Sequence, residues 1–168
     1  IVLRTPIKKD KDNQTEELRV RDALPYSTKL IINGGDRDEQ HPTQTLVDLY
    51  TIRKEKGRIA GLTIGLGGDV GGSRTVKSLI YITAKYGVKF IIISPELSQI
   101  PDDLREYLIR HKIDFEEHED AREHAHLFDV YYVVRIQTED NQKDARRSLF
   151  QKYGIRSFWR ADQELLKI

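Results

Sequence analysis

Short apolar runs alternate with amphipathic stretches along this chain. Runs with the composition of β-strands lie at residues 1–3, 29–32, 62–66, 88–94, 113–117 and 129–134. Stretches with helical periodicity lie between or after them, at residues 16–24, 41–56, 73–86, 102–112 and 121–127, with further helical pieces beyond residue 143. Strands that alternate with helices over short connections indicate an α/β domain. We therefore predict an α/β three-layer sandwich with a mostly parallel, Rossmann-like sheet.

The longest predicted helix, 41–56, is bounded by residues with known positional preferences. Pro42 would occupy its first position, where the missing N–H costs nothing, and Gly57 would end it. By helical spacing, one face of this helix is lined by Leu46, Leu49, Tyr50 and Arg53.

The other elements differ in how strongly the pattern marks them. Residues 88–94 contain the continuous apolar run Phe90 to Ile93, which is typical of a strand covered on both faces, and 129–134 are expected to form a second buried strand. Residues 113–117 are expected at a sheet edge. The weak helix 16–24 should stop before Pro25, and residues 33–36 have the composition of a turn.

The composition excludes several kinds of chemistry. The 168 residues include no cysteine, which excludes disulfides, zinc–thiolate sites and thiol nucleophiles. Lys and Arg number 28 against 27 Asp and Glu, and the resulting net charge of +1 provides no electrostatic footprint for nucleic acid. Apolar runs such as Phe90 to Ile93 are far too short to span a membrane. We expect no nucleic acid or membrane partner, and the absence of cysteine suits a cytoplasmic location.

Candidate binding residues follow the predicted strands, because ligands of parallel α/β sheets lie beyond the carboxyl ends of the strands. These candidates are Arg4, His41, Gln44, Arg74, Arg135 and Gln137. His41 and Gln44 are three positions apart at the start of a helix, so they share a face there. Arg135 and Gln137 alternate to the same side of a strand end.

The chemistry of these side chains suits an anionic small molecule. A histidine at a helix N-terminus can donate to a carbonyl oxygen, and an amide can bind an NH2 group. The guanidinium of Arg74 offers a planar fork to a carboxylate or phosphate. With no G-x-S-x-G elbow and no phosphate loop in the sequence, catalysis would rest on positioning and on stabilising developing charge. The alternative for each position is a structural one: a capping histidine, a solvated glutamine and ordinary surface arginines.

The glycine-rich turn at residues 65–73 raises the alternative of a dinucleotide-binding dehydrogenase. Counting from Gly65 and Gly67, the third glycine of that fingerprint falls on Val70. The following strand ends in Ser94, where a ribose-binding carboxylate is expected. We therefore expect no nicotinamide cofactor.

Histidines near residue 120 raise the alternative of a metal site. His118, His124 and His126 lie close in sequence to several glutamates, Glu117, Glu119 and Glu123. His124 and His126 would project from different faces of a helix, so they could not share an ion there. We expect solvated helix residues, and neither a metal nor another cofactor.

Several separate motifs, in order, resemble those of aspartate carbamoyltransferases. They are Val2-Leu3-Arg4 with Pro6, Asn33-Gly34-Gly35-Asp36, QHPTQTLVDLY at residues 40–50, Gly68-Asp69, Arg74-Thr75-Val76, Ser78-Leu79, Ser94-Pro95-Glu96, Asp129-Val130-Tyr131-Tyr132 and Arg135-Ile136-Gln137. The resemblance covers nearly the whole chain. The sister family, ornithine carbamoyltransferase, is the weaker match around Arg74 and after residue 134.

The resemblance implies transfer of a carbamoyl group from carbamoyl phosphate to L-aspartate, the committed step of pyrimidine biosynthesis. By the same resemblance, Arg4 and His41 contact carbamoyl phosphate and act in catalysis, and Gln44 holds its NH2 group. The L-aspartate would be bound by Arg74, Arg135 and Gln137. The family implies a homotrimer of catalytic chains, with or without regulatory chains. Residues 1–40 would be the last strands of the carbamoyl-phosphate lobe, and residues 41–168 an L-aspartate lobe that is incomplete at its C-terminus.

Departures from the family pattern support a competing interpretation. The family's Lys-Tyr-Gly before the arginine is Gly71-Gly72-Ser73 here, and its Lys-Glu-Arg after R-x-Q is Thr138-Glu139-Asp140. The family's Ser-Thr-Arg-Thr-Arg loop would precede residue 1, and its His-Pro-Leu-Pro-Arg segment would follow Ile168. The first residue is Ile and the sequence contains no Met, so we expect a piece of a larger enzyme that does not turn over substrate alone. The alternative is a non-catalytic ligand-binding or regulatory module derived from the same fold.

Overall fold

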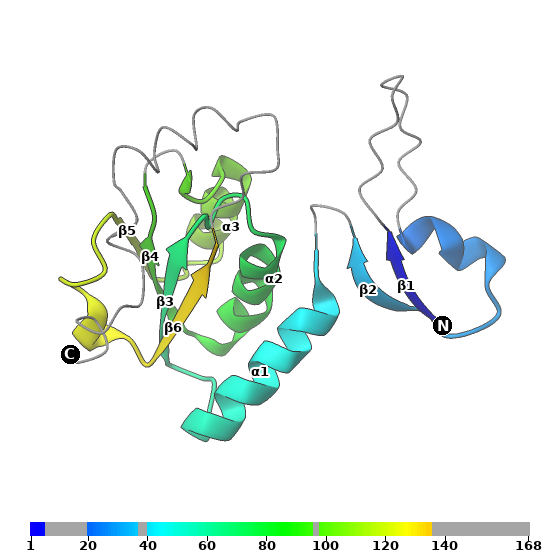
Figure 1. Cartoon of the computed structure of the whole chain (residues 1–168), viewed down its shortest axis with the longest axis horizontal. Coiled ribbons are helices and arrows are strands. Elements are labelled where there is room, and N and C mark those ends of the chain that lie inside the picture. The colour runs from blue at the N-terminus through cyan, green and yellow to red at the C-terminus, as the bar shows by residue number, and fades with distance from the viewer. Residues whose placement is uncertain (6–19, 37–39, 96–97, 136–168) are drawn as a thin grey trace.

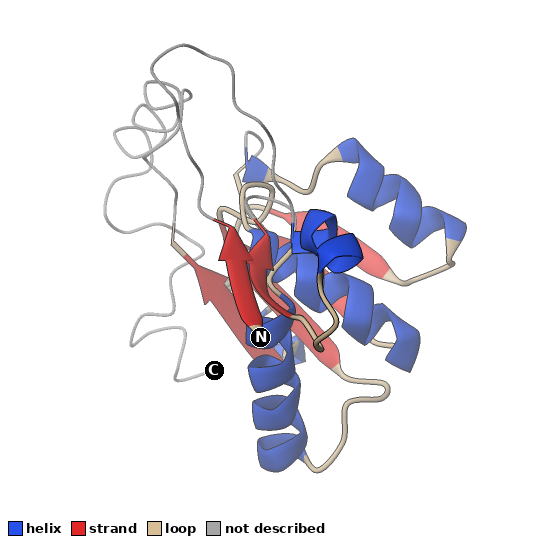
Figure 2. Ribbon diagram, turned by 90° about the vertical axis from the view of Figure 1, so that its right-hand side faces the viewer, coloured by secondary structure: helices blue, strands red, loops and turns tan. Residues whose placement is uncertain are grey.

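The described residues form two separate parallel sheets (Figure 1). The computed structural model describes residues 1–5, 20–36, 40–95 and 98–135. The smaller sheet pairs β1 (Val2–Thr5) with β2 (Ile32–Asp36), and η1 (Val20–Tyr26) lies between them in sequence. The larger sheet has the order β5-β4-β3-β6. Figure 2 looks from the side of the smaller sheet and shows β1 and β2 in front of the larger one.

The elements of the larger unit alternate between strands and helices, as the sequence predicts. They are α1 (Pro42–Lys56), β3 (Thr63–Gly68), α2 (Arg74–Thr83), η2 (Ala84–Tyr86), β4 (Lys89–Ile93), α3 (Asp102–Arg110), β5 (Phe115–His118), η4 (Ala125–Leu127) and β6 (Val130–Val134). Every strand pairing in both sheets is parallel, which confirms the α/β class with a parallel sheet.

The two faces of the larger sheet are covered differently. One face carries Ile64, Leu66, Phe90 and Ile92, which are fully buried under side chains of α1, α2 and α3. The opposite face carries Ile91 and Ile93, which pack against a smaller cluster that includes Ala121, Phe128 and Tyr131. Among the described residues, α-helices therefore cover one face, and the turn before η4, together with η4, lies over the other.

The sequence predicts an edge position for β5 and a buried position for β6, the two outer strands of the larger sheet. β5 lies at one edge, as predicted. β6 lies at the other edge of the described sheet and its side chains are only partly buried, with Val133 42% exposed, so the prediction of a buried strand there is wrong. The apolar run at 130–134 is explained partly by its contact with β3 and partly by packing of Tyr131 and Tyr132 on opposite faces.

The predicted ends of α1 are confirmed, although its predicted apolar face is not buried. His41 is the N-cap, Pro42 is the first helical residue, and Gly57 ends the helix at a left-handed φ of 72°. Thr45 and Ile52 are buried, whereas Leu46 and Tyr50 are 64% and 69% exposed. α1 therefore contacts the core of the larger unit through a different stripe from the one that apolar spacing marks.

Three local predictions need correction. Residues 33–36, expected as a turn, form most of β2, because Asn33 and Asp36 pair with Leu3 and Thr5 of β1. Of the weak helix predicted at 16–24, residues 16–19 lie outside the described residues, and the rest belongs to the 3-10 helix η1, which contains Pro25. The helix predicted at 121–127 is reduced to the single turn of η4. In each case local composition predicted the wrong element because strand pairing or a tight turn decides the backbone.

Candidate functional site

Both the backbone and the ring of His41 are held at the head of α1. The backbone N–H of His41 donates to the Ser78 hydroxyl of α2 at 2.9 Å. The ring Nδ1 of His41 accepts from the backbone N–H of Gln44 at 3.4 Å. Because Nδ1 is an acceptor, the ring proton lies on Nε2, and that atom can donate to a ligand oxygen.

Two guanidinium groups converge close to this imidazole. Arg4 lies on β1 of the smaller sheet, and Arg74 is the first residue of α2, directly after the N-cap Ser73. A Cβ placed on Gly35 would lie 3.7 Å from both the Nε of Arg4 and the Nη1 of Arg74. Glycine at this position therefore leaves an open backbone surface beneath two cationic side chains.

The electrostatics of His41 follow from this arrangement. Burial lowers the pKa of His41 below its usual value of 6.5, and the positive charges of Arg74 and Arg4 lower the pKa further. The imidazole is therefore neutral near pH 7, with its Nε2 proton available for donation. A neutral donor flanked by two fixed cations can bind a phosphate or carboxylate beside a polarised carbonyl.

The side-chain amide of Gln44 is oriented by a network that reaches the larger sheet. Its Nε2 donates to Oδ1 of Asp48, one turn further along α1, at 2.9 Å. The other carboxylate oxygen of Asp48 accepts from the hydroxyl of Tyr132 on β6 at 3.2 Å. With its NH2 group directed at Asp48, the amide presents its oxygen on the other side, as an acceptor for an NH2 group of a ligand.

The glycine-rich turn after β3 serves close backbone packing. A Cβ on Gly68 would collide with the carbonyl oxygen of Val134, and one on Gly71 with that of Gln99. The buried hydroxyl of Ser94 lies 2.7 Å from the carbonyl oxygen of Gly68, so the ends of β3 and β4 are joined. The turn thus brings α2, and with it Arg74, close to the ends of three neighbouring strands.

Family comparisons match the two sheets to two successive domains. The model described as "Aspartate/ornithine carbamoyltransferase, carbamoyl-P binding domain" matches residues 1–54. The model described as "Aspartate/ornithine carbamoyltransferase, Asp/Orn binding domain" matches residues 60–162. This chain belongs to the aspartate/ornithine carbamoyltransferase family.

Individual members of the carbamoyltransferase family give the same result. The aspartate carbamoyltransferase catalytic subunit of Methanopyrus kandleri is 52% identical over 139 residues, which are 83% of this chain and 42% of that protein. The Cenarchaeum symbiosum catalytic subunit is 49% identical over 119 residues, covering 71% of this chain and 38% of that protein. The chain therefore spans less than half the length of these relatives.

Solved carbamoyltransferase structures share the fold. The catalytic subunit of M. jannaschii aspartate transcarbamoylase superposes with a TM-score of 0.76 at 39% identity, over 90% of this chain and 47% of the other. Aspartate transcarbamoylase from Trypanosoma cruzi, in complex with carbamoyl phosphate, gives a TM-score of 0.79 at 26% identity, over 99% of this chain and 50% of the other.

The structure groups some of the predicted carbamoyltransferase site residues and leaves others apart. Arg4, His41 and Arg74 form one electrostatic group, and Gln44 adjoins His41 on α1. Arg135 directly follows β6, whose last residue Val134 pairs with Gly68 at the end of β3. Arg135 therefore lies at the carboxyl ends of the strands, next to the turn that leads to α2. Gln137, predicted beside Arg135, lies outside the described residues.

Sequence reasoning missed two residues of this site. Asp48 and Tyr132 hold the amide of Gln44, and they are 84 positions apart. The spacing of Gln44 and Asp48 by four residues on one helix was an available signal for their contact. Nothing in the local pattern around Tyr132 indicates its partner.

Proposed function

We propose that this chain provides part of the active site of an aspartate carbamoyltransferase. The reaction transfers the carbamoyl group of carbamoyl phosphate to L-aspartate and gives N-carbamoyl-L-aspartate and phosphate, the committed step of pyrimidine biosynthesis. The observation that carries the proposal is the convergence of Arg4 and Arg74 on a neutral His41 where the two sheets adjoin. The relatives that match the chain carry this enzyme's name.

The geometry suggests how carbamoyl phosphate binds. Its phosphate is attracted by the fixed guanidinium of Arg4. The Nε2–H of His41 donates to the carbonyl oxygen, and the amide oxygen of Gln44 accepts from the carbamoyl NH2. The donor at the carbonyl then stabilises the negative charge that develops on its oxygen when the carbon is attacked.

L-Aspartate is assigned to the other side of the site. We assign its carboxylates to Arg74, Arg135 and Gln137, because arginine forks bind carboxylates in a defined orientation. The amine of aspartate attacks the carbonyl carbon, a tetrahedral intermediate forms, and the bond to phosphate breaks. A T. cruzi relative that has been solved with both carbamoyl phosphate and aspartate supports this pair of substrates.

The organisation of the enzyme is also proposed. We place a carbamoyl-phosphate lobe at the start of the chain and an L-aspartate lobe after it, so the site lies between lobes. The carbamoyl-phosphate domain model reaches residue 54, past the boundary expected at residue 40, and so includes most of α1. We propose a cytoplasmic homotrimer of catalytic chains, which regulatory chains can accompany, with no cofactor. Within the described residues, no helix is long and apolar enough to cross a membrane.

Two arginine variants in the full-length protein test the assignment. Arg135→Ala should raise the KM for L-aspartate at least about tenfold while leaving the Kd for carbamoyl phosphate within about twofold, since a charge-assisted bond is worth roughly 1.5–3 kcal/mol. Arg4→Ala should weaken carbamoyl phosphate instead. Arg58→Ala, at an exposed position after α1, is the matched control.

Three results would count against the proposal. Equal loss of both substrates in Arg135→Ala would refute the division of the site. Turnover of L-ornithine in preference to L-aspartate would assign the protein to the sister activity. Absence of N-carbamoyl-L-aspartate formation by the full-length wild-type protein would favour a non-catalytic ligand-binding module.

A further inference from the structure

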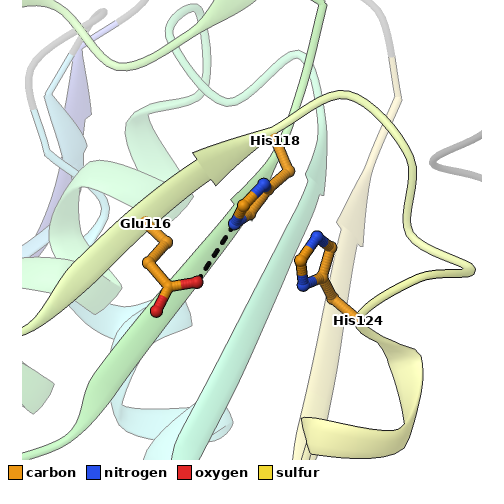
Figure 3. Close-up of side chains that lie close together, drawn as sticks. All are labelled: Glu116, His118 and His124. Carbon is orange, nitrogen blue, oxygen red and sulfur yellow. Dashed lines mark hydrogen bonds and ion pairs between the residues drawn. The ribbon is translucent and has the colours of Figure 1, made fainter.

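Three metal-ligating side chains gather at the β5 edge of the larger sheet, on a face that the proposed active site does not use. We propose that Glu116, His118 and His124 form a binding site for a divalent transition-metal ion of the zinc type. The ligand atoms of these residues all lie within 4.8 Å of one another. Figure 3 shows the carboxylate of Glu116 bonded to the imidazole of His118 beside β5, with the ring of His124 next to that of His118.

The fold brings these residues together from two segments. Alternation along β5 puts Glu116 and His118 on one face, level with Ile91 and Ile93 of β4. Glu117 points to the opposite face, where it pairs with Arg105 of α3.

After β5 the chain turns back over this face of the sheet and carries His124 to it. Buried Ala121 packs with Ile91 and Ile93, and its carbonyl accepts from the backbone N–H of His124 at 3.1 Å. The ring of His124 consequently stacks on that of His118, with centroids 3.7 Å apart.

This arrangement explains why sequence spacing excluded a metal. That exclusion compared His124 with His126 on one helix. In the structure His124 instead lies next to His118 of β5, and Glu116 of the same strand is the third candidate ligand. A helical argument does not apply here, because only residues 125–127 form a helical turn.

The distances suit metal coordination. Nε2 of His118 and Oε2 of Glu116 are 3.1 Å apart. Ligand atoms bound at 2.0–2.2 Å in a tetrahedral zinc site lie roughly 3.4 Å from each other. The ring of His124 would have to turn out of its stacking on His118 to direct a nitrogen at the same ion. The other carboxylate oxygen of Glu116 is held by Lys89 at 2.6 Å, which leaves Oε2 as a single, oriented ligand.

The donor set selects the class of ion. Two imidazole nitrogens and one carboxylate oxygen favour Zn²⁺, Co²⁺, Ni²⁺ or Cu²⁺, whereas Mg²⁺ and Ca²⁺ prefer oxygen ligands throughout. The side chains of His118 and Glu116 are 32% and 41% exposed, so an ion can enter and water can complete its coordination. Because its ligands come from β5 and from the turn after it, a bound ion would join the edge strand to that turn.

Titration of the protein with Zn²⁺, after purification without a histidine tag, tests the site. We expect one ion per chain by calorimetry, and visible absorption typical of a four-coordinate N/O site when Co²⁺ is the probe. His118→Gln and His124→Gln should each weaken Zn²⁺ binding at least about tenfold. His111→Gln and His126→Gln, at exposed histidines outside the cluster, are the matched controls and should bind normally.

Glu116→Gln keeps a hydrogen-bond acceptor for Lys89 and separates ligand loss from misfolding. It should retain the wild-type circular dichroism spectrum and still bind Zn²⁺ more weakly. Unchanged affinity in both His118→Gln and His124→Gln would overturn the proposal. So would a wild-type Kd for Zn²⁺ weaker than about 100 µM, since such binding is expected of scattered surface histidines.

Discussion

The hydroxyl of Tyr132 donates a hydrogen bond to the carboxylate of Asp48 at 3.2 Å, and so joins β6 to α1. The same carboxylate accepts from the side chain of Gln44 at 2.9 Å. The sheet therefore determines the orientation of an amide at the head of a helix. In the proposed carbamoyltransferase site, Tyr132 is a positioning residue that acts on substrate through Asp48 and Gln44.

Tyr132→Phe is expected to disorient Gln44 without unfolding the protein. Loss of one hydrogen bond to a charged group, worth roughly 1.5 kcal/mol or more, should reduce kcat/KM in the full-length enzyme by about tenfold. The loss should appear mainly in the KM for carbamoyl phosphate. Tyr50→Phe, at a side chain that is 69% exposed, is the control, and equal kinetics of the two variants would contradict the positioning role.

His41 is expected to titrate below its usual pKa. Burial is the largest cause of the lowered pKa, and the positive charges of Arg74 and Arg4 lower it further, so the folded protein disfavours the imidazolium form. The unfolded chain takes up this proton first as the pH falls below 6.5, and stability should therefore decrease with falling pH across this range. NMR titration of the ring should give a midpoint below 6.5.

A charge variant separates the causes of that low pKa. Arg74→Ala removes one of the two cations, so the midpoint of His41 should move upward, toward 6.5. Arg110→Ala, at the exposed end of α3, should leave the midpoint where it is. A midpoint that does not respond to Arg74→Ala would show that Arg74 does not lower the pKa of His41, and would leave burial and Arg4 as the causes.

Gly65→Ala is expected to destabilise the larger sheet. A Cβ at this position would lie 2.8 Å from the ring of Tyr131 and 2.9 Å from that of Phe128, distances that require the rings to move. We expect a loss of roughly 1–3 kcal/mol, measured by urea denaturation, as for other overpacked cores. Phe128→Leu in the same chain should recover part of the loss, and strict additivity of the two changes would argue against this contact.

Arg105→Lys is expected to weaken the attachment of α3 to β5. The guanidinium donates two hydrogen bonds to Glu117, at 3.0 and 3.1 Å, and an ammonium group cannot reproduce this paired geometry. Because Arg105 is 30% exposed and solvent screens the pair, we expect a loss of about 1 kcal/mol that shrinks at high salt. Arg110→Lys is the control, and equal denaturation midpoints would contradict a stabilising role.

Local sequence signals predicted those parts of the fold that local physics decides. The cap at His41, the first-turn Pro42 and the left-handed Gly57 depend on backbone geometry near one helix, and all three were predictable. The apolar face of α1 was not, since Leu46 and Tyr50 are exposed while Ile52 is buried. Which stripe of a helix faces a sheet depends on the path of the chain, which spacing alone does not contain.

Some residues of the candidate site were likewise predictable from the sequence, and some of its contacts were not. The positions of Arg4, His41 and Arg74 followed from the rule that ligands gather beyond the ends of parallel strands, and the structure brings these three residues together. The contacts of Tyr132 with Asp48, and of His124 with His118, connect residues that no shared periodicity relates. Such contacts arise only when the sheet has formed.

The two cations beside His41 belong to different units of the fold, Arg4 to the smaller sheet and Arg74 to helix α2 of the larger unit. Arg74 and His41 are joined within the larger unit through α2 and Ser78, whereas Arg4 belongs to β1. His41 is also tied to the smaller sheet, because α1, which it caps, packs against β2 as well as α2 and lies mostly within the match to the carbamoyl-phosphate domain. A change in the placement of one unit against the other would therefore alter how Arg4 and Arg74 surround this imidazole, and the pKa of His41, which both charges lower, would respond to it.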